Sequence, residues 1–291
     1  MAEIIPFDDR DGFIWQDGKM VPWREAHVHV LTHGLHYASC VFEGVRIYDG
    51  KVFKNTEHNQ RLHKSAEILG FKIPYSVEEL DKAVIETAKA NKVENGYVRP
   101  VAWRGSEMMA ISAQQTKIHV AIAAWTWAKY FSKEAFERGL KLKTSPWKRP
   151  APDTAPTASK AAGLYMICTM SKHAAEQEGF DDALMLDYRG YIAEATGANI
   201  FLVMNGEIHT PTPDCFLDGI TRRTVIGLAK DRQIKVIERH IKPDELSNAQ
   251  EVFLTGTAAE ITPVGSIDHH KFTVGPVIKT LTEDFQKLVR A

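Results

Sequence analysis

Tight-turn dipeptides are the feature of this 291-residue sequence that most restricts its fold. Asp17-Gly18 and Asp49-Gly50 are flanked by β-forming residues, and Arg189-Gly190 and Asn205-Gly206 repeat the pattern in the second half of the chain. Such pairs favour the short turns that join antiparallel strands. The sequence therefore predicts β-hairpins in both halves, rather than the regular strand–helix–strand units of a parallel sheet.

Amphipathic segments alternate with these hairpins. Apolar residues at helical spacing predict helices over 57–69, 161–178, 221–232 and 276–289, and Ser76 with Glu79 has the spacing of a capping box that opens another helix. Strands are expected at 97–103, 118–125 and 199–204. This mixture predicts an α+β protein with largely antiparallel sheets.

A segment without clear periodicity separates two such sets of elements. Residues 125–134 have no regular pattern, and a new alternation begins at Leu140. The prolines between 145 and 158 predict an extended loop, since none of them fits inside a helix or a central strand. We expect a smaller N-terminal α/β domain at 1–128, an interdomain loop at 129–137 and a larger C-terminal domain at 138–291.

Charge and cysteine usage restrict the partners and the compartment. The 36 basic and 37 acidic residues give a formal net charge of −1, which disfavours binding to nucleic acid or to an anionic membrane surface. Cys40, Cys168 and Cys215 lie far apart in the sequence and form neither a CxxC motif nor the even set of a disulfide framework, and the acidic N-terminus does not resemble a signal peptide. No apolar run reaches the ~18 residues of a membrane span. We expect a cytoplasmic protein that binds small molecules.

A group of histidines is the first candidate site. It comprises His27, His29, His33 and His36, and the sequence predicts that His27 and His29 share one face of a strand. No carboxylate or cysteine at ligand spacing accompanies them, so we expect no metal site there.

Lys160 is a stronger candidate. It lies where the proline-rich loop enters a predicted helix, among small residues that would let a planar cofactor approach closely. Desolvation at such a position lowers the pKa of a lysine and makes its free amine a nucleophile toward an aldehyde. The segment is compatible with a Schiff-base lysine, although these residues taken alone are more typical of a solvated lysine near a helix start.

Three further segments complete a possible cofactor site. Glu194 leaves a hairpin strand at a turn, Gly219-Ile220-Thr221 opens a predicted helix, and Gly256-Thr257-Ala258 follows a strand with small residues. The last two can present free backbone N–H groups to an anion. A lysine, a carboxylate and two anion cradles are the set that pyridoxal phosphate needs.

The chain resembles the fold-type IV pyridoxal-phosphate enzymes (the D-amino-acid aminotransferase-like fold, with a pseudo-barrel sheet in the larger domain), and within them the bacterial branched-chain amino-acid aminotransferases. The matching segments are His36-Tyr37, 41–46, 58–66, Tyr97-Val98-Arg99-Pro100, Ser159-Lys160-Ala161 with Tyr165, 194–199, 219–222 and 256–264.

The resemblance implies pyridoxal 5'-phosphate as cofactor and a role for each matching residue. Lys160 would hold the cofactor and move the proton, Glu194 would bind the pyridine nitrogen, and Tyr165 would bind the phenolic oxygen. Arg61 would bind the phosphate together with Ile220, Thr221, Gly256 and Thr257, and Leu217 would lie against the ring.

The resemblance also implies the substrates. Leucine, isoleucine and valine would exchange their amino groups with 2-oxoglutarate or glutamate by a ping-pong mechanism. The apolar pocket would be lined by Phe42, Gly44, Tyr97, Trp127 and Tyr130, with Tyr37, Met109 and Ile111 supplied by a partner subunit. Arg46 and Arg99 would bind the distal carboxylate of glutamate, and the N–H groups of Thr257 and Ala258 the α-carboxylate.

Three other functions stay open. A D-amino-acid transaminase and an aminodeoxychorismate lyase have the same fold, and a protein that binds pyridoxal phosphate or an amino acid without catalysis is a more distant alternative. The family builds each site from two subunits, so a homodimer is the expected minimum and a hexamer is common among the bacterial members.

Overall fold

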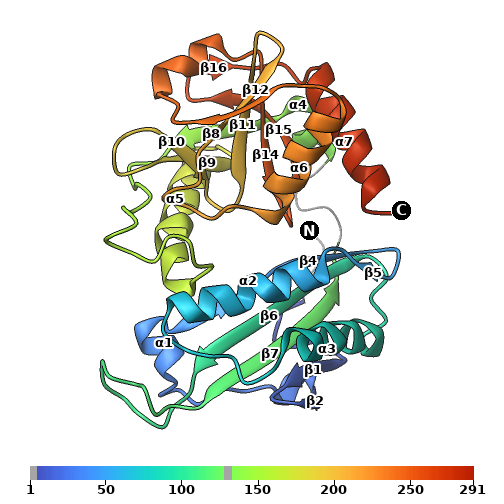
Figure 1. Ribbon diagram of the computed structural model, residues 1–291, viewed down its shortest axis with the longest axis vertical. Helices are drawn as coiled ribbons and strands as arrows, with labels where there is room; N and C mark the ends of the chain where they lie inside the picture. Colours follow the sequence, from blue (N-terminus) through green and yellow to red (C-terminus); the bar gives the residue numbers. More distant parts are fainter. Residues whose placement is uncertain (1–4, 128–132) are drawn as a thin grey trace. The chain divides into compact units, whose positions relative to one another are not determined.

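The computed structural model describes residues 5–127 and 133–291. The chain divides into two compact units (Figure 1). Unit 1 comprises Met1–Ala128 with Ser159–Gly163, and unit 2 comprises Lys129–Ala158 with Leu164–Ala291. No described helix combines the length and the hydropathy needed to cross a lipid bilayer.

Unit 1 is built on an antiparallel sheet, which has seven strands within its described residues. The strand order is β2-β1-β7-β6-β4-β5, and β3 also pairs with β6. The strands are β1 (Phe13–Gln16), β2 (Lys19–Pro22), β3 (Cys40–Phe42), β4 (Val45–Tyr48), β5 (Lys51–Val52), β6 (Gly96–Arg104) and β7 (Ile118–Thr126).

Both predicted hairpins of unit 1 are confirmed. Asp17-Gly18 joins β1 to β2 and Asp49-Gly50 joins β4 to β5. All four of these residues have positive φ, the conformation that this kind of two-residue turn requires. The predicted strand around His27 and His29 is wrong: residues 26–29 have no regular secondary structure, and both histidines are exposed.

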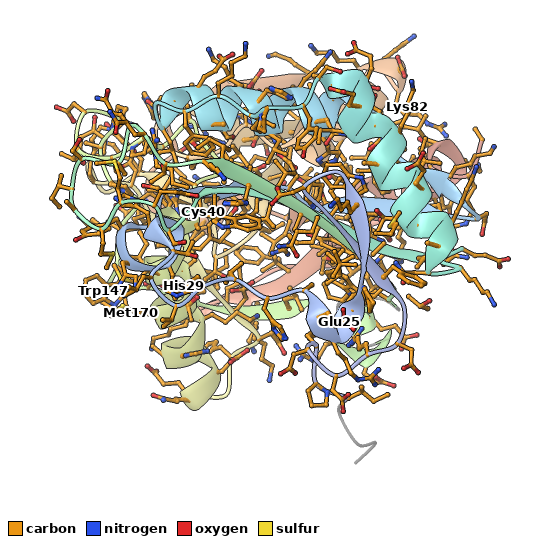
Figure 2. The ribbon with its side chains drawn as sticks, turned by 90° about the horizontal axis from the view of Figure 1, so that it is seen from below. Glu25, His29, Cys40, Lys82, Trp147 and Met170 are labelled. Atoms are coloured by element: carbon orange, nitrogen blue, oxygen red, sulfur yellow. The ribbon has the colours of Figure 1, made fainter. Side chains whose placement is uncertain are left out.

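The helices α2 (Asn55–Ile68) and α3 (Val77–Ala90) cover one face of the unit 1 sheet (Figures 1 and 2), whereas α1 (His33–Tyr37) packs against Trp103 on the other face. A 3-10 turn at Trp23–Glu25 precedes these helices in the sequence. Leu62 of α2 and Leu80 of α3 pack against Val98 and Ile122 of the sheet, while Lys82 points outward from α3 (Figure 2). The predicted capping box of α3 is present, because Ser76 Oγ accepts from the Glu79 N–H at 3.2 Å and Glu79 Oε2 accepts from the Ser76 N–H at 2.6 Å.

The described part of unit 2 contains a nine-stranded sheet that closes on itself. The order is β10-β9-β8-β15-β14-β11-β12-β13, and β10 also pairs with β11, so the first six strands form a ring. The strands are β8 (Leu140–Thr144), β9 (Asp182–Leu186), β10 (Ile192–Ala195), β11 (Asn199–Met204), β12 (Glu207–Pro211), β13 (Val236–Arg239), β14 (Glu251–Gly256), β15 (Glu260–Ile267) and β16 (His270–Lys271). The predicted pseudo-barrel sheet is confirmed.

The unit 2 sheet contains parallel pairs as well as hairpins. β8 runs parallel to both β9 and β15, and β12 runs parallel to β13. Each parallel pair needs a long connection instead of a tight turn, and α5 (Met166–Gln177) lies in the connection from β8 to β9. The expectation of largely antiparallel sheets thus describes unit 1 better than unit 2.

The remaining helices lie close to the predicted ranges. They are α4 (Lys133–Arg138), α6 (Ile220–Asp231) and α7 (Pro276–Leu288), with 3-10 turns at Ala162–Tyr165 and Pro243–Asn248. The helix predicted over 161–178 is therefore a 3-10 turn followed by α5. The helix α4 occupies part of the segment predicted as an interdomain loop.

Segment 159–163 belongs to unit 1, although the sequence pattern places it in the C-terminal domain. Ser159 Oγ donates to the carbonyl of Ser65 on α2 at 3.0 Å, and the Lys160 N–H donates to Ser65 Oγ at 2.9 Å. The Phe42 N–H donates to the Lys160 carbonyl at 3.2 Å. These tertiary hydrogen bonds, which sequence order does not reveal, attach the segment to unit 1.

Candidate active site

Lys160 is anchored through its backbone to both α2 and the end of β3. The two hydrogen bonds, to Ser65 and from Phe42, fix its main chain. The residue is half-buried, and its ammonium lies over the Phe42 ring, 5.0 Å from the centroid. A lysine held this way on a rigid backbone, with its amine against an aromatic face, can present that amine to a ligand in a defined direction.

A buried carboxylate, Glu43, follows β3 and binds two side chains of α2. Arg61 donates to it twice, from Nε to Oε1 at 2.7 Å and from Nη2 to Oε2 at 2.9 Å. His58 Nδ1 contacts Oε2 at 2.7 Å. Glu43 is fully buried, and the side chains of His58 and Arg61 are 2% and 13% exposed. The Glu43 carboxylate thus fixes the position of Arg61, the predicted phosphate ligand.

The protonation states in this group follow from burial and charge. Burial alone raises the pKa of Glu43, but Arg61 and His58 outweigh it and hold that pKa well below its usual range. Burial lowers the pKa of His58, against the opposing effect of Glu43, and the nearby Arg61 and Lys160 cations lower it further. Glu43 is therefore an anion that only accepts, and neutral His58 donates its Nδ1 proton to it.

Sequence reasoning missed the roles of Glu43 and His58. The available signal is the i, i+3 spacing of His58 and Arg61, which places them on one face of a helix. Nothing in the local sequence indicates that this face meets Glu43.

The sheet face opposite the helices carries most of the predicted substrate residues of unit 1. Arg46 and Trp125 are the cross-strand partners of Tyr97 on β4 and β7, and Phe42 is paired with Val101, four residues from Tyr97. Directly paired residues share a face, and so do residues two or four apart on one strand. Tyr97, Arg99, Arg46 and Phe42 therefore project from the same side of the sheet.

Aromatic rings and an arginine are in contact on this face. Tyr97 lies 5.3 Å from Trp125 and 4.8 Å from Trp127 between ring centroids. The Arg99 guanidinium lies over Phe42 at 4.8 Å and over Tyr97 at 5.4 Å. The structure thus brings apolar ring surface and a cation together, which is the combination needed to accept both an aliphatic and an acidic side chain.

Gly44 and Arg46 complete this group. A Cβ on Gly44 would overlap the Tyr97 hydroxyl, so glycine is required for that hydroxyl to occupy its position. Arg46 is buried, with its guanidinium 5.4 Å from the centroid of Tyr48. The predicted pocket residue Tyr130 lies outside the described residues.

Tyr37, Met109 and Ile111 lie on the surface of unit 1, with 41%, 43% and 84% of their surface exposed. The segments that carry them are joined by His33, which stacks on Tyr37 at 4.6 Å and contacts the Ala110 carbonyl through Nε2 at 2.9 Å. Their exposure is compatible with the expected contribution to a partner subunit.

In unit 2, Glu194 lies at the point where the ring of strands closes. It is the residue of β10 that pairs with Asn199 of β11, and its side chain is 11% exposed. Asn199 Nδ2 donates to Glu194 Oε2 at 3.2 Å and to the Leu217 carbonyl at 3.0 Å. Arg149, which sequence reasoning missed, lies with Nε 3.3 Å from Glu194 Oε1.

The two predicted anion cradles lie close to this carboxylate in unit 2. Asn199 pairs with Thr255, next to Gly256 at the end of β14, and a Cβ on Gly256 would lie 3.3 Å from the carbonyl of Gly197. A Cβ on Gly219, the N-cap of α6, would overlap Asn199 Oδ1. The Glu194 hairpin, the 256–258 turn and the start of α6 are therefore neighbours.

Free backbone donors are present in this region. No side chain caps the N-terminus of α6, so the N–H groups of Ile220 and Thr221 in its first turn have no partner within the helix. Thr257 and Ala258 lie in the half-buried turn between β14 and β15, and Tyr165 is half-buried immediately before α5. The N–H groups at the start of α6 and in the 257–258 turn fit an anion such as a phosphate or a carboxylate.

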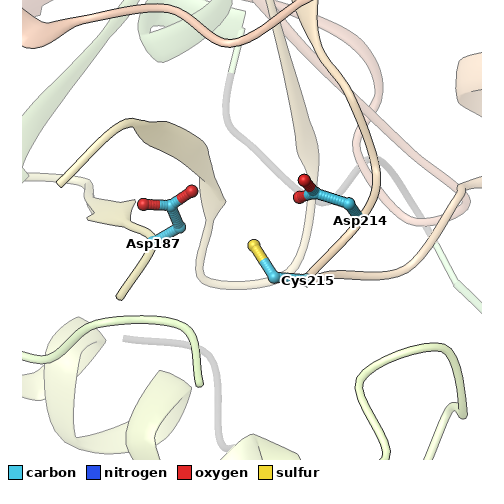
Figure 3. Close-up of side chains that lie close together, drawn as sticks. All are labelled: Asp187, Asp214 and Cys215. Carbon is cyan, nitrogen blue, oxygen red and sulfur yellow. The ribbon is translucent and has the colours of Figure 1, made fainter. Parts of the chain in front are cut away.

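A second polar cluster in unit 2 joins Asp187, Asp214 and Cys215 (Figure 3). Arg189 Nη2 contacts Asp187 at 2.7 Å and Asp214 at 2.9 Å, and His240 Nε2 contacts Asp214 at 2.9 Å. Because cationic and hydrogen-bonding partners already hold both carboxylates, we interpret this cluster as a structural link between the 187–191 turn and the loop after β12.

Comparison with known proteins assigns the family. The chain belongs to the class IV aminotransferases, because the model of that family (amino-transferase class IV) matches residues 40–267. The predicted family resemblance is therefore confirmed.

The relatives are similar over nearly the whole chain. The branched-chain-amino-acid aminotransferase of Pseudomonas aeruginosa is 42% identical over 97% of this chain and 94% of its own length. The crystal structure of the branched-chain amino acid aminotransferase of Escherichia coli has a TM-score of 0.93 and 40% identity, with 97% and 95% of the two chains covered. A second solved branched-chain amino acid aminotransferase, in complex with pyridoxamine 5'-phosphate, has a TM-score of 0.93 and 38% identity, with 96% and 94% covered.

Proposed function

We propose that this protein transfers the amino group of leucine, isoleucine or valine to 2-oxoglutarate, with pyridoxal 5'-phosphate as cofactor. The observation that carries the proposal is the sheet face of unit 1, where the rings of Phe42, Tyr97 and Trp127 lie beside the Arg99 guanidinium. Relatives at 40–42% identity that are named branched-chain-amino-acid aminotransferases support it.

The residues present fit the cofactor. The Lys160 amine would hold its aldehyde, Glu194 its ring nitrogen and Tyr165 its phenolic oxygen. Leu217 would lie against the ring, and the phosphate would take Arg61 with the donors at Ile220, Thr221, Gly256 and Thr257. When bound, pyridoxal phosphate supplies the aldehyde that takes up an amino group and the ring that accepts electrons from Cα.

The chain's own groups would then do the acid–base work. The Lys160 amine, released when a substrate amine replaces it, would move the proton of the substrate's Cα. The Glu194 carboxylate would hold a proton on the ring nitrogen, because an anion favours the protonated ring. The same groups would serve both half-reactions, which gives a ping-pong order of substrates.

Substrate binding would use two kinds of contact. The aromatic rings with Gly44 would accept the branched aliphatic side chain, and Arg46 with Arg99 would bind the distal carboxylate of glutamate or 2-oxoglutarate. The N–H groups of Thr257 and Ala258 would hold the α-carboxylate in either case. Tyr37, Met109 and Ile111 would reach the pocket of a partner subunit, so a homodimer is the minimum assembly and a hexamer is compatible with it.

A substrate panel tests the proposal. The purified protein with pyridoxal phosphate and 2-oxoglutarate should convert L-leucine to its oxo acid and form glutamate, whereas D-alanine and a simple primary amine should react poorly. Strong turnover of D-alanine without turnover of L-leucine would favour the D-amino-acid transaminase, and formation of pyruvate from aminodeoxychorismate would favour the lyase.

A chemical test separates catalysis from simple binding. Borohydride reduction followed by peptide mapping should find the cofactor fixed to Lys160. The variant Glu194→Gln, at saturating cofactor, should keep this attachment and lose most of the proton-transfer rate. Absence of any fixed cofactor in the wild type would support the non-catalytic binding protein instead.

A further inference from the structure

Arg149 is a buried arginine that lies in the loop following β8 and is 4% exposed. Its N–H donates to the Leu186 carbonyl at 2.8 Å, and its backbone forms a parallel bridge with Asp187. Its Nη1 donates to the Leu164 carbonyl at 3.4 Å and to Cys168 Sγ at 3.2 Å. Both the main chain and the far end of the side chain are therefore fixed by unit 2.

This fixed guanidinium faces the Glu194 carboxylate. Arg149 Nε lies 3.3 Å from Oε1, while Asn199 Nδ2 donates to Oε2 at 3.2 Å. The two carboxylate oxygens are thus held from two different elements, the loop after β8 and the strand β11. A carboxylate held at both oxygens has a defined orientation before any ligand arrives.

The charge of Arg149 also affects the ionisation of Glu194. Burial disfavours the ionised form of a carboxylate, and a fixed cation close to it offsets that cost. Burial also lowers the pKa of Arg149, but Glu194 outweighs it with smaller contributions from Cys168, Tyr165 and Cys215, so that the pKa is raised and Arg149 stays charged.

We propose that Arg149 is a positioning residue for the cofactor's ring nitrogen: its buried positive charge keeps Glu194 ionised and oriented, so that the carboxylate can bind that nitrogen in its protonated form. The inference rests on the proposed function, in which Glu194 faces the ring nitrogen. In this role Arg149 itself touches neither the cofactor nor the substrate.

The test compares two ligands on the full-length apoprotein. One ligand is pyridoxal 5'-phosphate, and the other is its carbocyclic analogue, in which a C–H group replaces the ring nitrogen. Dissociation constants are measured for the wild type, Arg149→Gln, Arg149→Lys and a control, Arg239→Gln, which removes a different arginine–glutamate pair of unit 2, Arg239 with Glu245.

The proposal predicts a loss that depends on the ring nitrogen. Arg149→Gln should weaken pyridoxal phosphate binding by about tenfold or more, since it leaves a buried carboxylate without its cation. Affinity for the carbocyclic analogue should change by less than about twofold, because the analogue has no nitrogen for Glu194 to bind. Arg149→Lys should recover most of the loss, and Arg239→Gln should alter neither affinity.

Two other results for Arg149→Gln would count against the proposal. Equal losses for both ligands in Arg149→Gln would indicate a general structural role, and no loss for either would remove Arg149 from cofactor binding. If thermal unfolding of the apoprotein shows that Arg149→Gln does not fold, Arg149→Lys takes its place in the test. Equally weakened binding of both ligands to Arg149→Lys overturns the proposal, and unchanged affinities for both support it. A wild type that binds neither ligand overturns the proposed function itself.

Discussion

Arg61 binds Glu43 through two hydrogen bonds, Nε to Oε1 at 2.7 Å and Nη2 to Oε2 at 2.9 Å. The Glu43 carboxylate that accepts them is fully buried. Neutral His58 adds a third contact at 2.7 Å. The anion is therefore tolerated in the interior only because its partners are in place, and the position of Arg61 depends on it.

Replacing Glu43 with glutamine should lower the free energy of unfolding at pH 7 by about 3 kcal/mol, because it leaves a mostly buried guanidinium without its counter-ion. Chemical denaturation of the apoprotein measures the loss. The control is Glu67→Gln, which breaks an exposed pair with Lys64 and should cost less than about 0.5 kcal/mol. Similar losses in both variants would contradict the structural role of the buried pair.

The same group should make the protein sensitive to acid. Glu43 has a lowered pKa in the folded state, so it contributes stability above its ordinary value of 4.5 and loses that contribution as the pH falls toward the folded value. His58 also has a lowered pKa, so its contribution begins to fall below 6.5. Urea unfolding from pH 7 to pH 3 should therefore show the wild type and Glu43→Gln converging, and a constant gap would rule out ionisation of Glu43 as its source.

Gly44→Ala should impair the aromatic face of unit 1. The added Cβ would overlap the Tyr97 hydroxyl and displace that ring from Trp127. We expect KM for L-leucine to rise about tenfold or more, since a shift of a pocket wall weakens apolar contacts by ~1–3 kcal/mol. Gly227→Ala on α6 is the matched control, because its Cβ would meet no atom within 4 Å and alanine favours a helix. An unchanged KM in Gly44→Ala would place the substrate elsewhere.

The three thiols should be slow to react in the folded protein. Burial raises the pKa of Cys40 and Cys168 to about 11 and that of Cys215 to about 12, so little thiolate exists near neutral pH. A disulfide reagent at pH 8 should modify all three only after denaturation. Rapid reaction of one thiol in the native state, assigned by peptide mapping, would show that its surroundings open more readily than the structure indicates.

Local patterns were sufficient for the hairpins and most helices. Asp17-Gly18 and Asp49-Gly50 form turns whose conformation is decided by adjacent residues, and the Ser76–Glu79 capping box needs no distant partner. The strand predicted around His27 and His29 failed because alternation alone does not provide a neighbouring strand to pair with. The parallel pairing of β8 with β15 joins residues more than a hundred positions apart, and only the family resemblance anticipated the closed sheet.

The sequence predicted those residues of the candidate site that lie in a recognisable motif. Lys160 and Glu194 stand in recognisable segments, so their candidate roles follow from residue type, surroundings and resemblance. Glu43, His58 and Arg149 were missed because each acts through a side chain contributed by another element. The choice of such partners is made by tertiary packing, which a single sequence does not display.

The closed ring of unit 2 also has a consequence for the order in which the protein is made. β8 ends at Thr144, yet one of its two neighbours, β15, ends only at Ile267, more than a hundred residues later in synthesis. Until then the nascent chain carries unpaired strand edges, the kind of surface on which chains aggregate. Chaperone dependence during synthesis should therefore be concentrated in the interval between translation of residues 144 and 267.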